Sequence, residues 1–82
     1  MYYLYILKCA DKTLYTGITV DPVRRVKEHN FSQRGAKYTR SRRPVKLVYA
    51  KKFRTWSGAA KEEFRIKALL RQEKIQLIKN SK

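Results

Sequence analysis

Cysteine is nearly absent from this 82-residue sequence, and no hydrophobic run is long enough to cross a membrane. The single cysteine, Cys9, excludes an internal disulfide and a cysteine-based metal site. It fits a reducing compartment, so we expect a cytoplasmic protein. The apolar stretch at residues 2–7 is far too short for a secretory signal, and no membrane association is expected. The length predicts a single domain over residues 1–82.

Acidic residues are also scarce. The sequence has 6 Asp and Glu against 21 Lys and Arg, for a formal net charge of +15. No acid lies between Glu28 and Glu62, an interval that includes Arg34, Lys37, Arg40, Arg42, Arg43, Lys46, Lys51, Lys52 and Arg54. A scattered excess of charge is usually a solvated surface, but this long acid-free stretch favours a polyanionic partner, above all nucleic acid. A membrane surface is the weaker alternative, because no helix is basic on one face and strongly apolar on the other.

Three segments have the composition of strands. Residues 2–7 are aromatic and β-branched, and residues 14–19 follow them after turn-forming residues at 10–13. These two segments predict an antiparallel hairpin. Residues 45–53 predict a third strand, in which Leu47, Tyr49 and Phe53 alternate onto one face.

Helices are expected between and after these strands. Asp21 and Pro22 form a strong helix start, and this helix should run to about Asn30. One short helical turn is expected around residues 36–39. Thr55 or Ser57 should cap a longer helix that ends near Leu70, and a last helix closes the chain. The pattern predicts an α+β fold.

The most informative residues are polar and dispersed along the chain. Strand alternation allows Tyr5 and Tyr15 to face one groove, and Gly17 leaves a gap in that face for a backbone or a phosphate. Arg25 and His29 are four residues apart and share one helix face. Taken singly, each has an ordinary structural explanation. We expect Cys9 to be a core residue and Trp56 to anchor the start of its helix.

Glu63 is the least ordinary residue of the longer helix predicted to end near Leu70. At about 100° per residue it falls near the centre of an apolar helix face with Ala59, Ile66 and Leu70, whereas Glu62 falls towards the edge. A buried, unpaired carboxylate costs several kcal/mol, so Glu63 must be paired or bind a cation. An i,i+4 pair with Lys67 is one explanation. A metal ligand explains the core-facing position better.

The motifs together resemble the GIY-YIG nuclease superfamily, most closely its short stand-alone bacterial members and the catalytic subunit of branched-DNA structure-specific endonucleases. The resemblance covers nearly the whole chain and is carried by Tyr3-Leu4-Tyr5, Tyr15-Thr16-Gly17, Asp21-Pro22-Val23-Arg24-Arg25, His29-Asn30, Gly35-Ala36-Lys37-Tyr38-Thr39, Arg43-Pro44-Val45-Lys46-Leu47-Val48-Tyr49 and Glu63-Phe64-Arg65-Ile66-Lys67. It implies a small three-stranded antiparallel sheet flanked by helices.

The resemblance also implies a catalytic set: Tyr5, Tyr15, Arg25, His29 and Glu63. It implies that Glu63 holds one Mg²⁺ or Mn²⁺, and that Arg25 rather than Arg24 contacts the scissile phosphate. Tyr5, Tyr15 and His29 remain alternative activators of the attacking water.

The implied activity is metal-dependent hydrolysis of phosphodiester bonds in DNA by an endonuclease, structure-specific and related to repair. The expected nucleic-acid contacts are Arg24, Arg34, Lys37, Arg40, Arg42, Arg43 and Lys46. The sequence has no recognition helix or finger, so DNA shape or a protein partner would set substrate choice. The alternative is a DNA- or RNA-binding module on the same scaffold with little or no catalysis.

Overall fold

A computed structural model describes residues 1–32 and 34–81 of the chain. In chain order its elements are β1 (Tyr2–Lys8), β2 (Leu14–Thr19), α1 (Pro22–Phe31), α2 (Lys37–Arg40), β3 (Lys46–Phe53), α3 (Trp56–Lys67) and α4 (Arg71–Asn80). In the described residues no helix is long and apolar enough to span a lipid bilayer.

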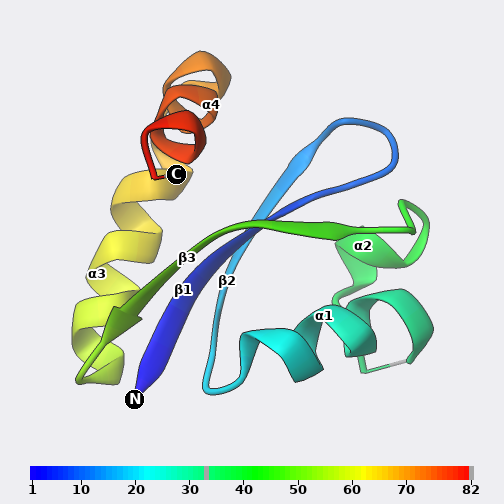
Figure 1. Cartoon of the computed structure of the whole chain (residues 1–82), viewed down its shortest axis with the longest axis horizontal. Helices are drawn as coiled ribbons and strands as arrows, with labels where there is room; N and C mark the ends of the chain where they lie inside the picture. The colour runs from blue at the N-terminus through cyan, green and yellow to red at the C-terminus, as the bar shows by residue number, and fades with distance from the viewer. Residues whose placement is uncertain (33, 82) are drawn as a thin grey trace.

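The three strands form one antiparallel sheet in the order β2-β1-β3 (Figure 1). The β1–β2 hairpin pairs Tyr5 with Gly17 and Leu7 with Tyr15. The expected α+β fold, a small three-stranded antiparallel sheet flanked by helices, is confirmed.

The two faces of the sheet are covered by different helices. Tyr5, Leu7 and Val45 form the core on one face, where Val26 of α1 packs against them. Leu4 and Ile6 form the core on the other face with Ile66 of α3. Figure 1 shows this division, with α1 and α2 on one side of the sheet and α3 and α4 on the other. Cys9 is buried in the first core, as expected.

Two expectations about the second half of the chain are wrong. Leu47 packs in the core with Tyr5, whereas Tyr49 and Phe53 pack in the core with Leu4. The reason is an irregularity in β3: Ile6 pairs with Tyr49 but Leu7 pairs with Leu47, so one extra residue breaks the alternation. The helix expected to reach Leu70 is also shorter, because α3 ends at Lys67 and α4 begins at Arg71.

The α1 helix is fixed at both ends. At its start, the Asp21 carboxylate accepts a hydrogen bond from the Arg24 backbone N–H, as the N-cap prediction requires. Near its end, Asn30 makes two hydrogen bonds with the Val45 backbone. The Arg43 guanidinium donates to the backbone carbonyls of His29 and Ser32. These contacts tie the last turn of α1 to the start of β3, and that turn carries His29.

Candidate active site

Tyr5 is the centre of the site, and its side chain is 1% exposed. It lies directly across from Gly17 in the hairpin, and a Cβ on Gly17 would come within 2.7 Å of the Tyr5 hydroxyl. The gap predicted at Gly17 is therefore filled by the phenol of Tyr5, and it leaves no room there for a phosphate. Gly17 is needed for this close approach, because any side chain would push the ring away.

His29 holds the Tyr5 hydroxyl from the opposite side. Its Nε2 lies 2.9 Å from Tyr5 Oη, and its Nδ1 lies 2.7 Å from Thr39 Oγ1. His29 and Thr39 are both fully buried. Burial, together with the nearby charge of Arg25, lowers the pKa of His29 to about 4. The imidazole is therefore neutral at neutral pH.

Hydrogen bonds around Thr39 decide which nitrogen of His29 carries the proton. The Thr39 hydroxyl donates to the Ala36 carbonyl at 2.9 Å, so its oxygen accepts from His29 Nδ1–H at 2.7 Å. The Ala36 N–H faces Nδ1 only from 3.3 Å. We therefore assign Nδ1 as the protonated nitrogen and Nε2 as the acceptor of the Tyr5 hydroxyl. In this tautomer Nε2 is free to take the phenol proton.

Arg25 lies on the same helix, one turn before His29. Its Nη1 donates to Glu28 Oε1 and to the Arg34 backbone carbonyl, each at 2.8 Å. The bond to the Glu28 carboxylate lowers the pKa of Glu28. Burial raises the pKa of Tyr5 to about 12, while a hydrogen bond with Arg25 opposes that rise. Arg25 thus lies near the Tyr5 hydroxyl and is 25% exposed, whereas Arg24 is 62% exposed and reaches only Glu28, at 3.9 Å.

Four aromatic rings connect the buried centre to the surface. Tyr15 lies 6.3 Å from Tyr5 and 5.2 Å from His29 between ring centroids, and it stacks on Tyr38 at 5.9 Å. The guanidinium of Arg42 lies over the outer ring, 4.0 Å from the Tyr38 centroid. The prediction that Tyr5 and Tyr15 share one face is confirmed. Tyr38 is exposed, so this row leads from solvent to Tyr5.

Glu63 lies on α3, on the other side of the sheet. Its charge is among the causes that raise the pKa of Tyr5. The expectation that Glu63 is more enclosed than Glu62 is wrong: their side chains are 26% and 14% exposed, respectively. Glu63 Oε2 lies 3.3 Å from Lys67 Nζ, the i,i+4 pair considered as the alternative, and Glu62 binds Arg65 through both oxygens. Burial therefore does not distinguish Glu63 from Glu62 as a metal ligand.

The donor set fits at most a sparsely ligated metal ion. Among the described residues, no group of three or more His, Cys, Asp or Glu side chains gathers to hold a metal. Mg²⁺ often binds proteins through one or two carboxylates and keeps several waters. Glu63 is 26% exposed, and its partner Lys67 is 57% exposed, so the single carboxylate fits such an ion.

The predicted nucleic-acid contacts differ in their exposure and in their partners within the protein. Arg24, Arg34, Lys37 and Lys46 have exposed side chains. Arg42 is stacked on Tyr38 and pairs with Asp11 at 2.9 Å. Arg43 binds two backbone carbonyls, a structural role that accounts for it without a ligand. Arg40 is exposed on α2, beside Thr39.

Reasoning from spacing alone missed two residues, Thr39 and Tyr38. Both lie on α2, a single helical turn whose sequence has no periodicity to align with α1. Only the resemblance, which extends through residues 35–39, could have drawn attention to them. Trp56, expected to anchor a helix start, is instead 59% exposed.

Comparison with known families identifies a nuclease-type domain. The family model described as the GIY-YIG catalytic domain matches residues 1–76. The chain therefore belongs to the GIY-YIG family.

Its relatives are small bacterial proteins. The chain is 56% identical to a UPF0213 protein of Syntrophus aciditrophicus (strain SB), over 96% of this chain and 91% of that protein. It is 54% identical to one from Desulfotalea psychrophila, over 98% of this chain and 73% of that one. A solution NMR structure of a UPF0213 protein from Bacillus halodurans matches with a TM-score of 0.62 and 45% identity, over 96% of this chain and 84% of that one.

Proposed function

We propose that this protein is a divalent-metal-dependent endonuclease that hydrolyses phosphodiester bonds in DNA. The observation that carries the proposal is the buried chain of hydrogen bonds Tyr5–His29–Thr39 with Arg25 beside it. A phenol that only filled a core would not need a neutral histidine and an arginine at its oxygen. Burying polar groups costs free energy unless each is hydrogen-bonded, and this cluster keeps them bonded around one oxygen.

In this proposal Tyr5 accepts the proton of the attacking water. Burial raises its pKa to about 12, so the free protein holds the phenol protonated at neutral pH. As the phenol takes the proton of the water, its own proton passes to His29 Nε2, and Arg25 offsets negative charge on the phenol oxygen. The water oxygen then bonds to phosphorus as the bond from phosphorus to the 3′ oxygen breaks.

His29 acts through Tyr5 in this scheme and does not contact the attacking water. Its Nε2 is already hydrogen-bonded to the Tyr5 hydroxyl, and its Nδ1 to Thr39. Tyr15 lies further out in the row of rings and would orient the water or the phosphate. Arg25 would offset charge on the non-bridging oxygens, which a guanidinium suits.

Glu63 would hold one Mg²⁺ or Mn²⁺, which supplies phosphate polarisation and stabilisation of the departing 3′ oxygen when bound. The carboxylate must leave Lys67 to do so, and an exposed i,i+4 pair is weak, about 0.2–0.5 kcal/mol. The cost of freeing Glu63 is therefore small beside the attraction of a divalent cation.

Exposed cations around α1 and α2 would supply sequence-independent phosphate contacts, chiefly Arg24, Arg34, Lys37 and Arg40. We propose a preference for DNA shape, such as nicks and branches, over base sequence, with a role in DNA repair. A protein partner could supply further substrate choice.

The experiment is a cleavage assay with duplex, nicked, branched and single-stranded DNA in Mg²⁺, in Mn²⁺ and in chelator. We expect metal-dependent cutting that Glu63→Gln lowers by about 100-fold or more, since it removes the only proposed ligand. Glu62→Gln is the matched control and should cut like the wild type. Equal loss in both variants, or no loss in Glu63→Gln, would contradict the metal-ligand role. DNA binding without any cutting by the wild type would instead favour the non-catalytic binding module.

A further inference from the structure

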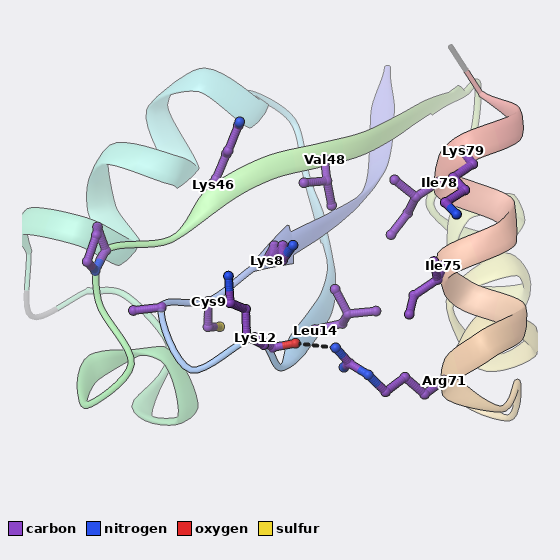
Figure 2. Close-up of a pocket in the computed structure, with 12 residues that line it drawn as sticks. Lys8, Cys9, Lys12, Leu14, Lys46, Val48, Arg71, Ile75, Ile78 and Lys79 are labelled. Atoms are coloured by element: carbon purple, nitrogen blue, oxygen red, sulfur yellow. Dashed lines mark hydrogen bonds between the residues drawn. The ribbon is translucent and has the colours of Figure 1, made fainter.

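A pocket of about 540 Å³ lies between the hairpin end of the sheet and α4 (Figure 2). Apart from Lys46, a predicted nucleic-acid contact, none of its lining residues belongs to the candidate active site. Its walls are apolar, with Leu14 and Val48 from the sheet and Ile75 and Ile78 from α4. The volume falls in the range of about 300–1,000 Å³ that is usual for small-molecule sites.

The pocket is surrounded by positive charge. Five of its twelve lining residues are cationic and none is acidic; the cations are Lys8, Lys12, Lys46, Arg71 and Lys79. None of the four lysines forms an ion pair with a carboxylate in the described part of the chain. The cluster therefore lacks counter-charge from the protein itself.

The positions of two of these lysines should destabilise the folded protein. Lys8 and Lys46 lie directly opposite each other on β1 and β3, so their side chains emerge from the same face of the sheet. Like charges in this position are destabilising. Leu14 lies on the other side of Lys8, which puts an apolar side chain next to the pair. An anion bound between the lysines would reverse the repulsion.

The wall of the pocket is fixed by a contact between distant parts of the chain. The Arg71 guanidinium donates to the Lys12 backbone carbonyl at 2.6 Å, as Figure 2 shows. Lys12 has a left-handed backbone (φ 73°), which places this carbonyl at the turn between β1 and β2. The bond holds the start of α4 against the hairpin, so the apolar walls face each other without a ligand.

We propose that this pocket binds one unpaired nucleotide, with the base between the apolar walls and the phosphates at Lys8 and Lys46. A nucleotide combines a flat, weakly polar ring with negative charge, which matches apolar walls under a cationic rim. Its source is either a free nucleotide or a single-stranded part of a nucleic acid. Only the choice of DNA as that nucleic acid rests on the proposed function.

The test is a binding measurement in chelator with the Glu63→Gln variant, so that cleavage plays no part. Methyl NMR signals of Leu14, Val48, Ile75 and Ile78 are followed with thymidine monophosphate, a short thymidine oligonucleotide, inorganic phosphate and an oligoglutamate peptide. We expect both nucleotide probes, or the oligonucleotide alone, to shift these methyls. Shifts with the oligonucleotide alone identify single-stranded nucleic acid as the source. Shifts with thymidine monophosphate that an added oligonucleotide does not strengthen identify a free nucleotide.

Charge variants measure how much the cationic rim of the pocket contributes to binding. Replacing both Lys8 and Lys46 with Gln should weaken oligonucleotide binding about tenfold, and should reduce the slope of log affinity against log salt by about 1.4. The matched control, Lys51→Gln with Lys52→Gln, removes two exposed lysines of β3 outside the pocket and should leave the methyl shifts intact. Ile75→Trp fills the pocket without changing its charge and should abolish the methyl shifts.

Three results would overturn the proposal. One is that the methyls respond equally to oligoglutamate, which would mean a cation cluster without selectivity for a nucleotide. Another is that inorganic phosphate binds as well as either nucleotide probe. The third is that Ile75→Trp, shown folded by its other NMR signals, still gives the wild-type response. Failure here leaves metal-dependent cleavage untouched, because that activity is measured separately with Glu63 intact.

Discussion

The two faces of the sheet are covered by cores of different chemistry. Under α3 and α4 the core is aliphatic, built on Leu4, Ile6 and Ile66. Under α1 and α2 it contains a phenol, an imidazole and a hydroxyl that are all buried and bonded to one another. An aliphatic core needs only shape and volume, whereas a polar one also needs every donor placed. Under the proposed function, the polar face is the one that carries the chemistry.

The largest effect should come from closing the space under Tyr5. Gly17→Ala places a methyl group 2.7 Å from the Tyr5 hydroxyl, so the phenol must leave His29. We expect a stability loss of about 1–3 kcal/mol and a cleavage loss of about 100-fold or more. Urea unfolding and the cleavage assay measure the two.

Gly58→Ala is the control for that substitution. Gly58 lies on the α3 side, and a methyl group there meets its nearest neighbours at 3.3 Å or more. The nearest neighbour is the Thr55 hydroxyl, a side-chain atom that can adjust, so stability should change little. If both variants behave alike, the polar face is no more constrained than the aliphatic one.

A smaller effect is expected from Thr39→Val, which keeps the shape and removes the hydroxyl that contacts His29 Nδ1. We expect a stability loss of about 1–3 kcal/mol from the unpaired buried group. Cleavage should fall in kcat more than in KM, because His29 then positions Tyr5 less well. Thr16 lies opposite Ile6 on the aliphatic face, so Thr16→Val should change neither the stability nor the cleavage rate. A larger stability loss from Thr16→Val would contradict the comparison.

The last prediction is a dependence of stability on pH, spread over more than two pH units. The pKa of His29 is lowered from 6.5 to about 4 by burial, so the unfolded chain binds the proton more readily than the folded protein. Stability from this residue is complete above pH 6.5 and is lost as the pH falls towards 4, at up to about 1.4 kcal/mol per pH unit. Urea unfolding at several pH values measures the slope. A His29→Gln variant with the same slope between pH 6.5 and 4.5 would rule out His29 as its source.

Local patterns predicted most of the fold. The residues that start α1 and α3 and the alternation of β1 and β2 act within a few residues of chain, and the structure has these elements where they were expected. The extra residue in β3 could not be predicted, because it depends on how β3 meets β1. The exposures of Glu62 and Glu63 depend on how α3 lies over β3, where Glu62 approaches Tyr49, and helix periodicity does not give that angle.

The candidate site was predictable as a set of residues and not as a mechanism. Alternation brought Tyr5 and Tyr15 together correctly. The bond between His29 and Thr39 joins residues ten positions apart through a loop, and no periodicity indicates it. Gly17 was expected to admit a phosphate, but only the structure shows that the Tyr5 ring takes that space.

The central claim is that the Tyr5 hydroxyl, held by His29, performs the chemistry. The most direct test is the single-turnover rate of DNA cleavage in Mg²⁺ by Tyr5→Phe, with Tyr49→Phe as the matched variant on the aliphatic face. We predict that Tyr5→Phe lowers the rate by about 100-fold or more while DNA affinity is retained, and that Tyr49→Phe cuts at the wild-type rate. A folded Tyr5→Phe protein that cleaves as fast as the wild type would contradict the account.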